Sequence, residues 1–424
     1  MSHADSAILQ LTDRLKDKYS WFRVLERNQP LILTILLIVF LLSSWLTGLP
    51  FNTSNRDVIH ILYEFPLKII RYAAYLFCLL AIGMNFLLGR YRFWNFAVIS
   101  FTAAITFLVC QSPDFCVWFL LILAEAPADF RRTLKVYALC QGFVLLFVPL
   151  MAAFGILSNV LFDSERLRQG LGFGWTTTAP MLFFFFILIS CRIQNAKMSD
   201  LTVFLFALSP VWLYFLTNTR MVFLCSLLFL ILIFTMNRKP HWFAFTEKRW
   251  FYYFLILLPL LLTVVAFTFV YSYSEGNTAL SFLNTLLSDR LDLTQKALET
   301  YGIHLFGHRI IWIGYSTEMP EVAQYNYVDI SYMNILLNYG VVVLISVVYF
   351  YSRLLALSWK QKDRVLMIII VFILVLSLSE VRLVNPLYNP FILLFGNFAL
   401  KHKYQTGLFR SAIRDTQSLP ENPA

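Results

Sequence analysis

The stretch FYYFLILLPLLLTVVAFTFVY, residues 251–271, contains no charged residue. A helix rises about 1.5 Å per residue, so about 20 apolar residues are needed to cross the roughly 30 Å hydrocarbon core of a bilayer. This stretch therefore predicts a transmembrane helix over residues 250–272. Because every backbone polar group must be satisfied inside a membrane, the same stretch excludes a loop or a lone strand there.

Working outward from this helix, similar apolar segments recur along the whole chain. Hydrophobic residues make up 59% of the 424 residues and charged residues only 14%, against about 25% charged residues in an average soluble domain. The segments lack the alternation of a β-barrel. We therefore predict an all-α, polytopic membrane protein with about twelve transmembrane helices. The predicted spans are 31–49, 65–88, 93–110, 112–125, 135–157, 176–191, 200–217, 220–237, 250–272, 330–352, 364–380 and 386–400.

Two of these twelve segments are weak. The segment 112–125 has an unbroken apolar run only from Phe115 to Ala124, and the segment 386–400 contains Pro386 and Pro390. Either could be re-entrant. Counting both as spans places most of the 34 Lys and Arg residues on the same side as the two termini. The positive-inside rule then predicts cytoplasmic termini in the inner membrane. The net charge of +10 is thus a topology signal, and no nucleic-acid partner is expected.

This topology divides the chain into five parts. The large extracytoplasmic loop, residues 273–329, is expected to hold one or two amphipathic helices that end at Gly302, followed by an irregular segment. The predicted parts are a cytoplasmic segment 1–30, helices one to nine in 31–272, the loop 273–329, helices ten to twelve in 330–400, and a disordered cytoplasmic tail 401–424.

Several basic residues lie on the outer side, against the orientation rule. A guanidinium beside a helix N-terminus is suited to bind an anion, because the N–H groups and the helix dipole both favour negative charge. Lipid headgroups, or Asp163, Glu165 and Glu380, could equally pair with any single arginine. For the group, we favour one shared anionic ligand. The residues concerned are Arg71, Arg166, Arg168, Arg220, Arg290, Arg309 and Arg382.

A carboxylate lies at the mouth of the predicted tenth helix, in YNYVDISYMNILLNYGVVVLIS, residues 325–346. Asp329, followed by Tyr332, is a candidate general base, because such a base must reach the proton that it removes. His304 and His308 are alternatives. Asp329 could also simply cap the helix. The two histidines have no obvious third ligand, so no metal site is expected.

A set of short motifs occurs in a fixed order along the second half of the chain. Together they resemble the Wzy-type polysaccharide repeat-unit polymerases, relatives of the O-antigen ligases. The ligases usually carry a His-Asn pair where this chain has Asp329, Ser331 and Tyr332, which favours a polymerase. The motifs are RLRQGLGF at 166–173, NTR at 218–220, SDRLD at 288–292, YGIHLFGH at 301–308 and VDISYMNILLNYG at 328–340.

The resemblance implies a glycosyltransferase that joins oligosaccharide repeat units carried on polyprenyl (undecaprenyl) pyrophosphate. Arginines would stabilise the leaving pyrophosphate without a metal or other cofactor. Flippase and chain-length regulator proteins and membrane lipids are the implied partners. A ligase that moves finished glycan to another acceptor is the nearest alternative. A lipid-linked oligosaccharide transporter is a second one. Such a protein would be expected to show intramembrane charges, inverted repeats or broken helices, whereas these span interiors are nearly free of charge apart from Lys68 and Arg71, and no internal repeat is visible.

Overall fold

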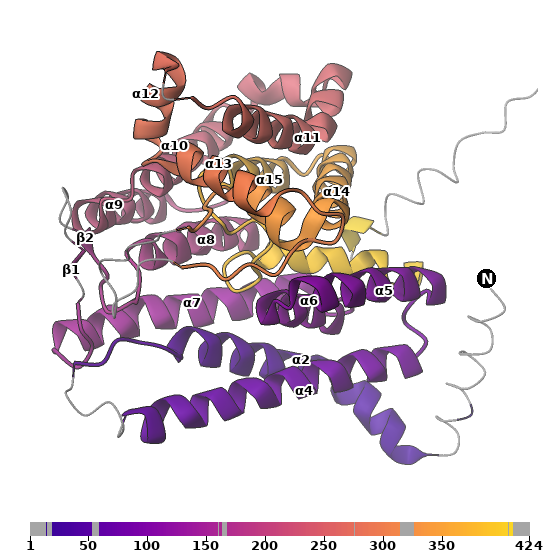
Figure 1. Cartoon of the computed structure of the whole chain (residues 1–424). Coiled ribbons are helices and arrows are strands. Elements are labelled where there is room, and N and C mark those ends of the chain that lie inside the picture. The colour runs from indigo at the N-terminus through magenta and orange to yellow at the C-terminus, as the bar shows by residue number, and fades with distance from the viewer. Residues whose placement is uncertain are drawn as a thin grey trace, which may run out of the picture.

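The structure is a computed structural model. It describes residue 14 and residues 19–52, 59–159, 161–162, 168–274, 276–313, 326–405 and 407–409. Helices dominate it, and one two-stranded antiparallel hairpin accompanies them (Figure 1). The elements are α2 (Ser20–Leu46), η1 (His60–Glu64), α4 (Phe65–Leu87), α5 (Phe93–Cys110), α6 (Pro113–Ala124), α7 (Phe130–Ala153), β1 (Leu161–Phe162), β2 (Arg168–Gln169), α8 (Thr178–Ile193), α9 (Asp200–Thr217), α10 (Arg220–Arg238), η2 (Pro240–Glu247), α11 (Arg249–Tyr271), α12 (Thr278–Leu286), α13 (Arg290–Tyr301), α14 (Ser331–Lys360), α15 (Arg364–Leu376), η3 (Pro390–Phe398) and η4 (His402–Tyr404).

The helices indicate a multi-pass membrane protein. Eight of those described are long and apolar enough to span a bilayer, and α6, α8 and α15 are shorter apolar helices. Their ends follow the sequence signals: Ser112, Ser199 and Asp363 each accept a hydrogen bond from a first-turn N–H and so cap α6, α9 and α15. Most boundaries fall within a few residues of the predicted spans.

The connections meet at two opposite ends of the bundle. We call one end the N-terminal face, where α2 begins and α4 ends, and the other the loop face, which carries α12 and α13 (Figure 1). Ion pairs join connections at the N-terminal face, such as Arg192 with Asp363 and Arg364 with Glu247. At the loop face, Phe51 bridges Leu157. Which face is cytoplasmic stays a prediction from the charge pattern.

Both expected features of the large loop are confirmed. Two short helices, α12 and α13, are followed by an irregular segment that is described as far as residue 313. α13 ends at Gly302, whose φ of +66° is open to glycine but strained for other residues. The prediction for residues 314–325 lies outside the described residues, as do those for most of 1–18 and for 410–424.

The predicted tenth span is present as α14, but this helix is interrupted. α14 is broken at Gly340, which has φ +86° and ψ 177°. The loop backbone fills the break: Val341 and Val342 donate hydrogen bonds to the carbonyls of His304 and Leu305. A Cβ on Gly340 would overlap the backbone of the loop. The carbonyls of residues 304 and 305 therefore replace two of the acceptors that the break removes.

The predicted twelfth span is wrong as an α-helix. Between Glu380 at the loop face and Leu400, which bridges Tyr91 at the N-terminal face, the chain is irregular and then forms the 3₁₀-helix η3. Non-helical backbone is stable at membrane depth only where protein buries it and satisfies it. Three of its carbonyl groups accept hydrogen bonds from buried side chains: Leu383 from Tyr351, Pro386 from Tyr137 and Tyr388 from Gln141.

Candidate functional site at the loop face

Arg290 is positioned by the start of α13. The side-chain oxygen of Asn284 accepts hydrogen bonds from the backbone N–H groups of Leu291 and Asp292, at 3.0 and 3.2 Å. Its amide nitrogen donates to Asp289, whose φ is +62°. The end of α12 thus caps α13 from outside, in place of the usual residue just before the helix. This arrangement fixes the direction in which Arg290 leaves the helix.

Arg290 lies between two carboxylates that are distant in sequence. Its Nε lies 3.2 Å from Oδ2 of Asp329, and its Nη2 lies 3.1 Å from Oε1 of Glu380. The side chain of Arg290 is mostly buried, as is that of Glu380. Burial raises the pKa of the Glu380 carboxyl, and Arg290 opposes that shift. One arginine therefore holds two acids together in a largely desolvated place.

The backbone around these acids is tied together as well. The Ser331 hydroxyl donates a hydrogen bond to the Glu380 carbonyl, and Ser331 N–H donates to the Ser377 carbonyl at 3.0 Å. These bonds join the start of α14 to the end of α15. Asp329 and Glu380 are consequently placed relative to each other by the scaffold, in addition to the shared arginine.

The capping alternative for Asp329 is wrong. The residue that precedes α14 is Ile330, and no side chain caps this helix. Asp329 lies one position earlier, and its carboxylate is directed to Arg290. Because a cap must accept a hydrogen bond from the first turn of its own helix, Asp329 serves the ion pair instead.

Arg382 lies beside the same cluster. Its guanidinium carbon stands 4.5 Å from the centre of the Tyr388 ring, in a cation–π contact, and its charge interacts with the Tyr327 hydroxyl. Arg382 also interacts electrostatically with Glu380. Burial raises the pKa of Tyr327, so this hydroxyl keeps its proton at neutral pH. Arg382 is thereby held between two rings close to the acids.

Arg220 is the first residue of α10, and the start of this helix is open. The residue before it, Thr219, makes no capping bond, because its hydroxyl pairs with that of Thr217. Within the described part of the chain, Arg220 has no carboxylate partner. Cys225, just over one turn further along, is near enough to Glu380 to interact with it electrostatically. This part of α10 therefore lies near the Arg290 cluster.

The other candidate residues are placed as follows. Arg168 lies on β2, whose hairpin contacts α9, and Arg309 is exposed in the segment after α13. Arg71, on α4, interacts with Asp114 at the start of α6. Tyr332 is a core residue, 1% exposed, whose hydroxyl donates to the Leu374 carbonyl. Arg166 lies outside the described residues.

His304 and His308 lie in the segment that enters the α14 break. Their rings stack with centres 5.2 Å apart, and both side chains are exposed. The nearest partner of His304 is the Tyr301 carbonyl, at 2.9 Å. Within the described ranges, no three His, Cys, Asp or Glu side chains are grouped so that they could hold a metal ion.

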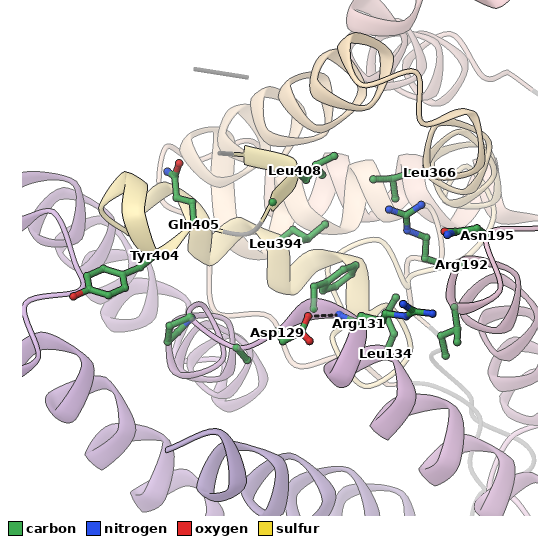
Figure 2. Close-up of a pocket in the computed structure, with 15 residues that line it drawn as sticks. Asp129, Arg131, Leu134, Arg192, Asn195, Leu366, Leu394, Tyr404, Gln405 and Leu408 are labelled. Atoms are coloured by element: carbon green, nitrogen blue, oxygen red, sulfur yellow. Dashed lines mark hydrogen bonds between the residues drawn. The ribbon is translucent and has the colours of Figure 1, made fainter. Parts of the chain in front are cut away.

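A cavity of about 450 Å³ lies at the opposite, N-terminal face (Figure 2). Figure 2 shows Arg192 and Asn195 on one side of it, Tyr404 and Gln405 on the other, and Asp129 bonded to the backbone of Arg131. None of the candidate residues lines this cavity. Arg192 at this cavity is already neutralised by Asp363.

Comparisons with models of known families, with curated proteins and with solved structures gave no match. The resemblance to the polymerases thus rests on the motifs alone. Sequence reasoning considered Glu380 only as a partner for an arginine, whereas the structure places it at the centre of the cluster. The available signal was an acidic residue beside Arg382 in an outer connection.

Proposed function

We propose that this protein is a polysaccharide polymerase that joins polyprenyl-pyrophosphate-linked oligosaccharide units at the loop face. The observation that carries the proposal is the Arg290 cluster, in which one arginine holds Asp329 and Glu380 close to α10, a helix whose start is uncapped. Strongly perturbed, desolvated charges gather at functional sites more often than elsewhere. The apolar helices behind the cluster suit a lipid-linked substrate.

In the proposed reaction, an acceptor hydroxyl oxygen attacks the anomeric carbon of the donor glycan. The hydroxyl proton passes to the Asp329 carboxylate, which Arg290 orients. The bond from the anomeric carbon to the pyrophosphate oxygen breaks, and its electron pair leaves with polyprenyl pyrophosphate. The leaving group gains negative charge, so the reaction needs fixed positive groups near it.

Arg220 is the residue best suited to that leaving group. It combines a guanidinium with the N–H groups and dipole of α10. Arg290 is less suited, because two carboxylates already occupy its guanidinium. We therefore assign Arg220 to the pyrophosphate and Arg290 to the positioning of Asp329, with Arg168, Arg309 and Arg382 as further candidates on this face.

The test is a strain that lacks the native gene and carries Arg220→Ala or Arg220→Lys. Surface glycan length is then examined on gels. The Ala protein should lose polymer but leave single repeat units on the surface, and Lys should rescue only in part because it lacks the bidentate fork. Arg249→Ala is the matched control, since Arg249 begins α11 at the opposite face as Arg220 begins α10.

Other outcomes would point elsewhere. Accumulated lipid-linked polymer without surface attachment would indicate the ligase alternative. Normal polymer from Arg220→Ala, with normal protein amounts, would contradict the assignment of this residue. Equal losses from Arg220→Ala and Arg249→Ala would indicate that the arginines act through insertion or folding.

The broken helix favours one second candidate, a transporter of lipid-linked oligosaccharide. Discontinuous helices are typical of transporter substrate sites, and α14 is interrupted at Gly340. A transporter defect would trap single lipid-linked units inside the cell, whereas a polymerase defect would leave them outside. Labelling of surface sugars in intact cells that carry Arg220→Ala separates the two.

A further inference from the structure

Five ring side chains follow one another along the loop face. We call Tyr301, His304, His308, Trp312 and Tyr327 the aromatic strip. Its ring centres are 5.2 Å apart for His304–His308, 6.2 Å for Tyr301–His308, 5.9 Å for Tyr301–Trp312 and 5.9 Å for Trp312–Tyr327. The residues come from the end of α13, from the segment after it and from the approach to α14. The strip thus connects elements that meet only in the folded protein.

Several polar atoms of the strip are already used by the protein. Trp312 Nε1 donates to Asn338 at 2.8 Å, and the Tyr301 hydroxyl accepts from Asn326 at 3.0 Å. The Tyr327 hydroxyl interacts electrostatically with Arg382. A ligand that binds Tyr301 or Trp312 would therefore contact mainly the faces and edges of their rings. Ring faces are electron-rich and attract weakly positive C–H groups.

The strip is also rigidly placed. His308 N–H donates to the Asn338 carbonyl, and Asn338 in turn donates from its side chain to Asn334. A Cβ on Gly307, which has φ +83°, would overlap the Asn338 backbone, so only glycine allows this approach. Side chains held in this way make a prearranged contact surface.

One end of the strip reaches the reaction site. Tyr327 is two residues from Asp329, interacts electrostatically with it, and contacts Arg382 beside Glu380. The other end, His304 and His308, is exposed. A ligand lying along the strip would place one terminus next to the carboxylate that is assigned to take the hydroxyl proton.

We propose that the aromatic strip is a carbohydrate subsite that stacks the pyranose rings of the acceptor glycan. One face of a pyranose presents several C–H groups together, which matches the faces of these rings. The hydroxyl groups at the sugar edge remain available to Asp329. That the bound glycan is the acceptor rests on the proposed function, whereas carbohydrate binding by the strip does not.

The test uses the full-length protein in detergent and lipid-free oligosaccharides released by mild acid from the source strain's surface polysaccharide. Saturation-transfer-difference NMR reports which sugar C–H groups contact the protein. Trp312→Ala should weaken binding about tenfold, the value of one good aromatic contact. Trp312→Phe keeps a ring and should retain most binding. Trp242→Ala, an exposed tryptophan at the N-terminal face, is the control.

Three results would overturn the subsite. Wild-type binding by Trp312→Ala would remove it directly. Equal losses from the Ala and Phe variants would show that the Trp312–Asn338 hydrogen bond anchors the loop and that the ring contributes nothing. If Trp312→Ala retained polyprenyl phosphate less well but bound sugar normally, the strip would be an interfacial belt that contacts lipid. The strip could also bind sugar while Arg220→Ala still gives full polymer. In that case the carbohydrate subsite would be supported and the assignment of Arg220 to the pyrophosphate would be wrong.

Discussion

Glu125 and Glu380 are two equally buried glutamates at opposite ends of the bundle. Each is 5% exposed, Glu125 in the connection between α6 and α7 and Glu380 in the connection after α15. Glu380 is paired with Arg290 at 3.1 Å. Among the described residues, one carboxyl oxygen of Glu125 has no hydrogen-bond partner. Burial raises the pKa of Glu125 to about 8, against a smaller opposing effect of Arg132.

The difference separates burial from function. A buried carboxyl without a close cation takes up a proton, because desolvation penalises the charged form. Glu125 is therefore neutral at pH 7, although it lines a cavity of about 430 Å³ together with Arg90 and Arg132. At the loop face, Arg290 offsets part of that penalty for Glu380 and also fixes Asp329. The loop face therefore holds a buried cluster of paired charges. The cavity at the N-terminal face that Glu125 lines holds a buried acid that is neutral instead.

Asp329→Asn, at the loop face, should have the largest effect of the substitutions considered. We expect polymer formation to fall by about 10²–10⁴-fold, the usual contribution of a general base. Protein amount and stability should change little by comparison, because Asp329 caps no helix. The measurements are glycan length and the thermal midpoint in detergent. Near-normal polymer would move the role of base to His304 or His308, or to a reaction that uses no protein base.

Arg290→Met should leave Glu380 as Glu125 is now, a buried carboxyl without a close cation. Removing one partner of a buried ion pair leaves uncompensated charge and lowers the free energy of unfolding by about 3–5 kcal/mol. Denaturant unfolding near pH 7 measures this loss. Adding Glu380→Gln to the same chain should recover part of it. A loss no larger than that of an exposed arginine would contradict the buried cluster.

Glu125→Gln tests the other half of the comparison. A carboxyl whose pKa rises from 4.5 to about 8 on folding stabilises the protein most below pH 4.5, and that stability is lost as the pH rises toward 8. We expect the Gln protein to be more stable than wild type near pH 8, by on the order of 2–4 kcal/mol. Unfolding at pH 5 and pH 8 provides the measurement. Parallel pH profiles for the two proteins would show that Glu125 does not titrate in this way.

Arg238→Ala should have the smallest effect. Arg238 pairs with Asp200 at the N-terminal face, but the side chains are 58% and 69% exposed. Solvent screens such pairs, so they contribute little to stability. No measurable shift in the unfolding midpoint is expected, and polymer length should be normal. A shift comparable to that of Arg290→Met would mean that burial does not distinguish the two ion pairs.

Hydropathy alone predicted the class of the protein and most helix boundaries. Residues 93–110 and 200–217 form helices with the predicted bounds, because the length of an apolar run and its polar flanks are local properties. The candidate site was only partly predictable. Charge and position indicated Arg290, Arg382 and Asp329, but Arg290 is 39 residues from Asp329 and 90 from Glu380 along the chain.

Local sequence is enough to predict that this chain forms apolar helices, which residues enter them, and that two short helices follow α11, since these features depend on runs of neighbouring residues. Only the tertiary structure decided the break at Gly340, the irregular course after Glu380, and the sharing of Arg290 by two acids. A backbone leaves helical geometry inside a bundle only where distant groups supply its hydrogen bonds, as His304 and Tyr351 do here. Such partners are chosen by packing in three dimensions, and no window of sequence contains them.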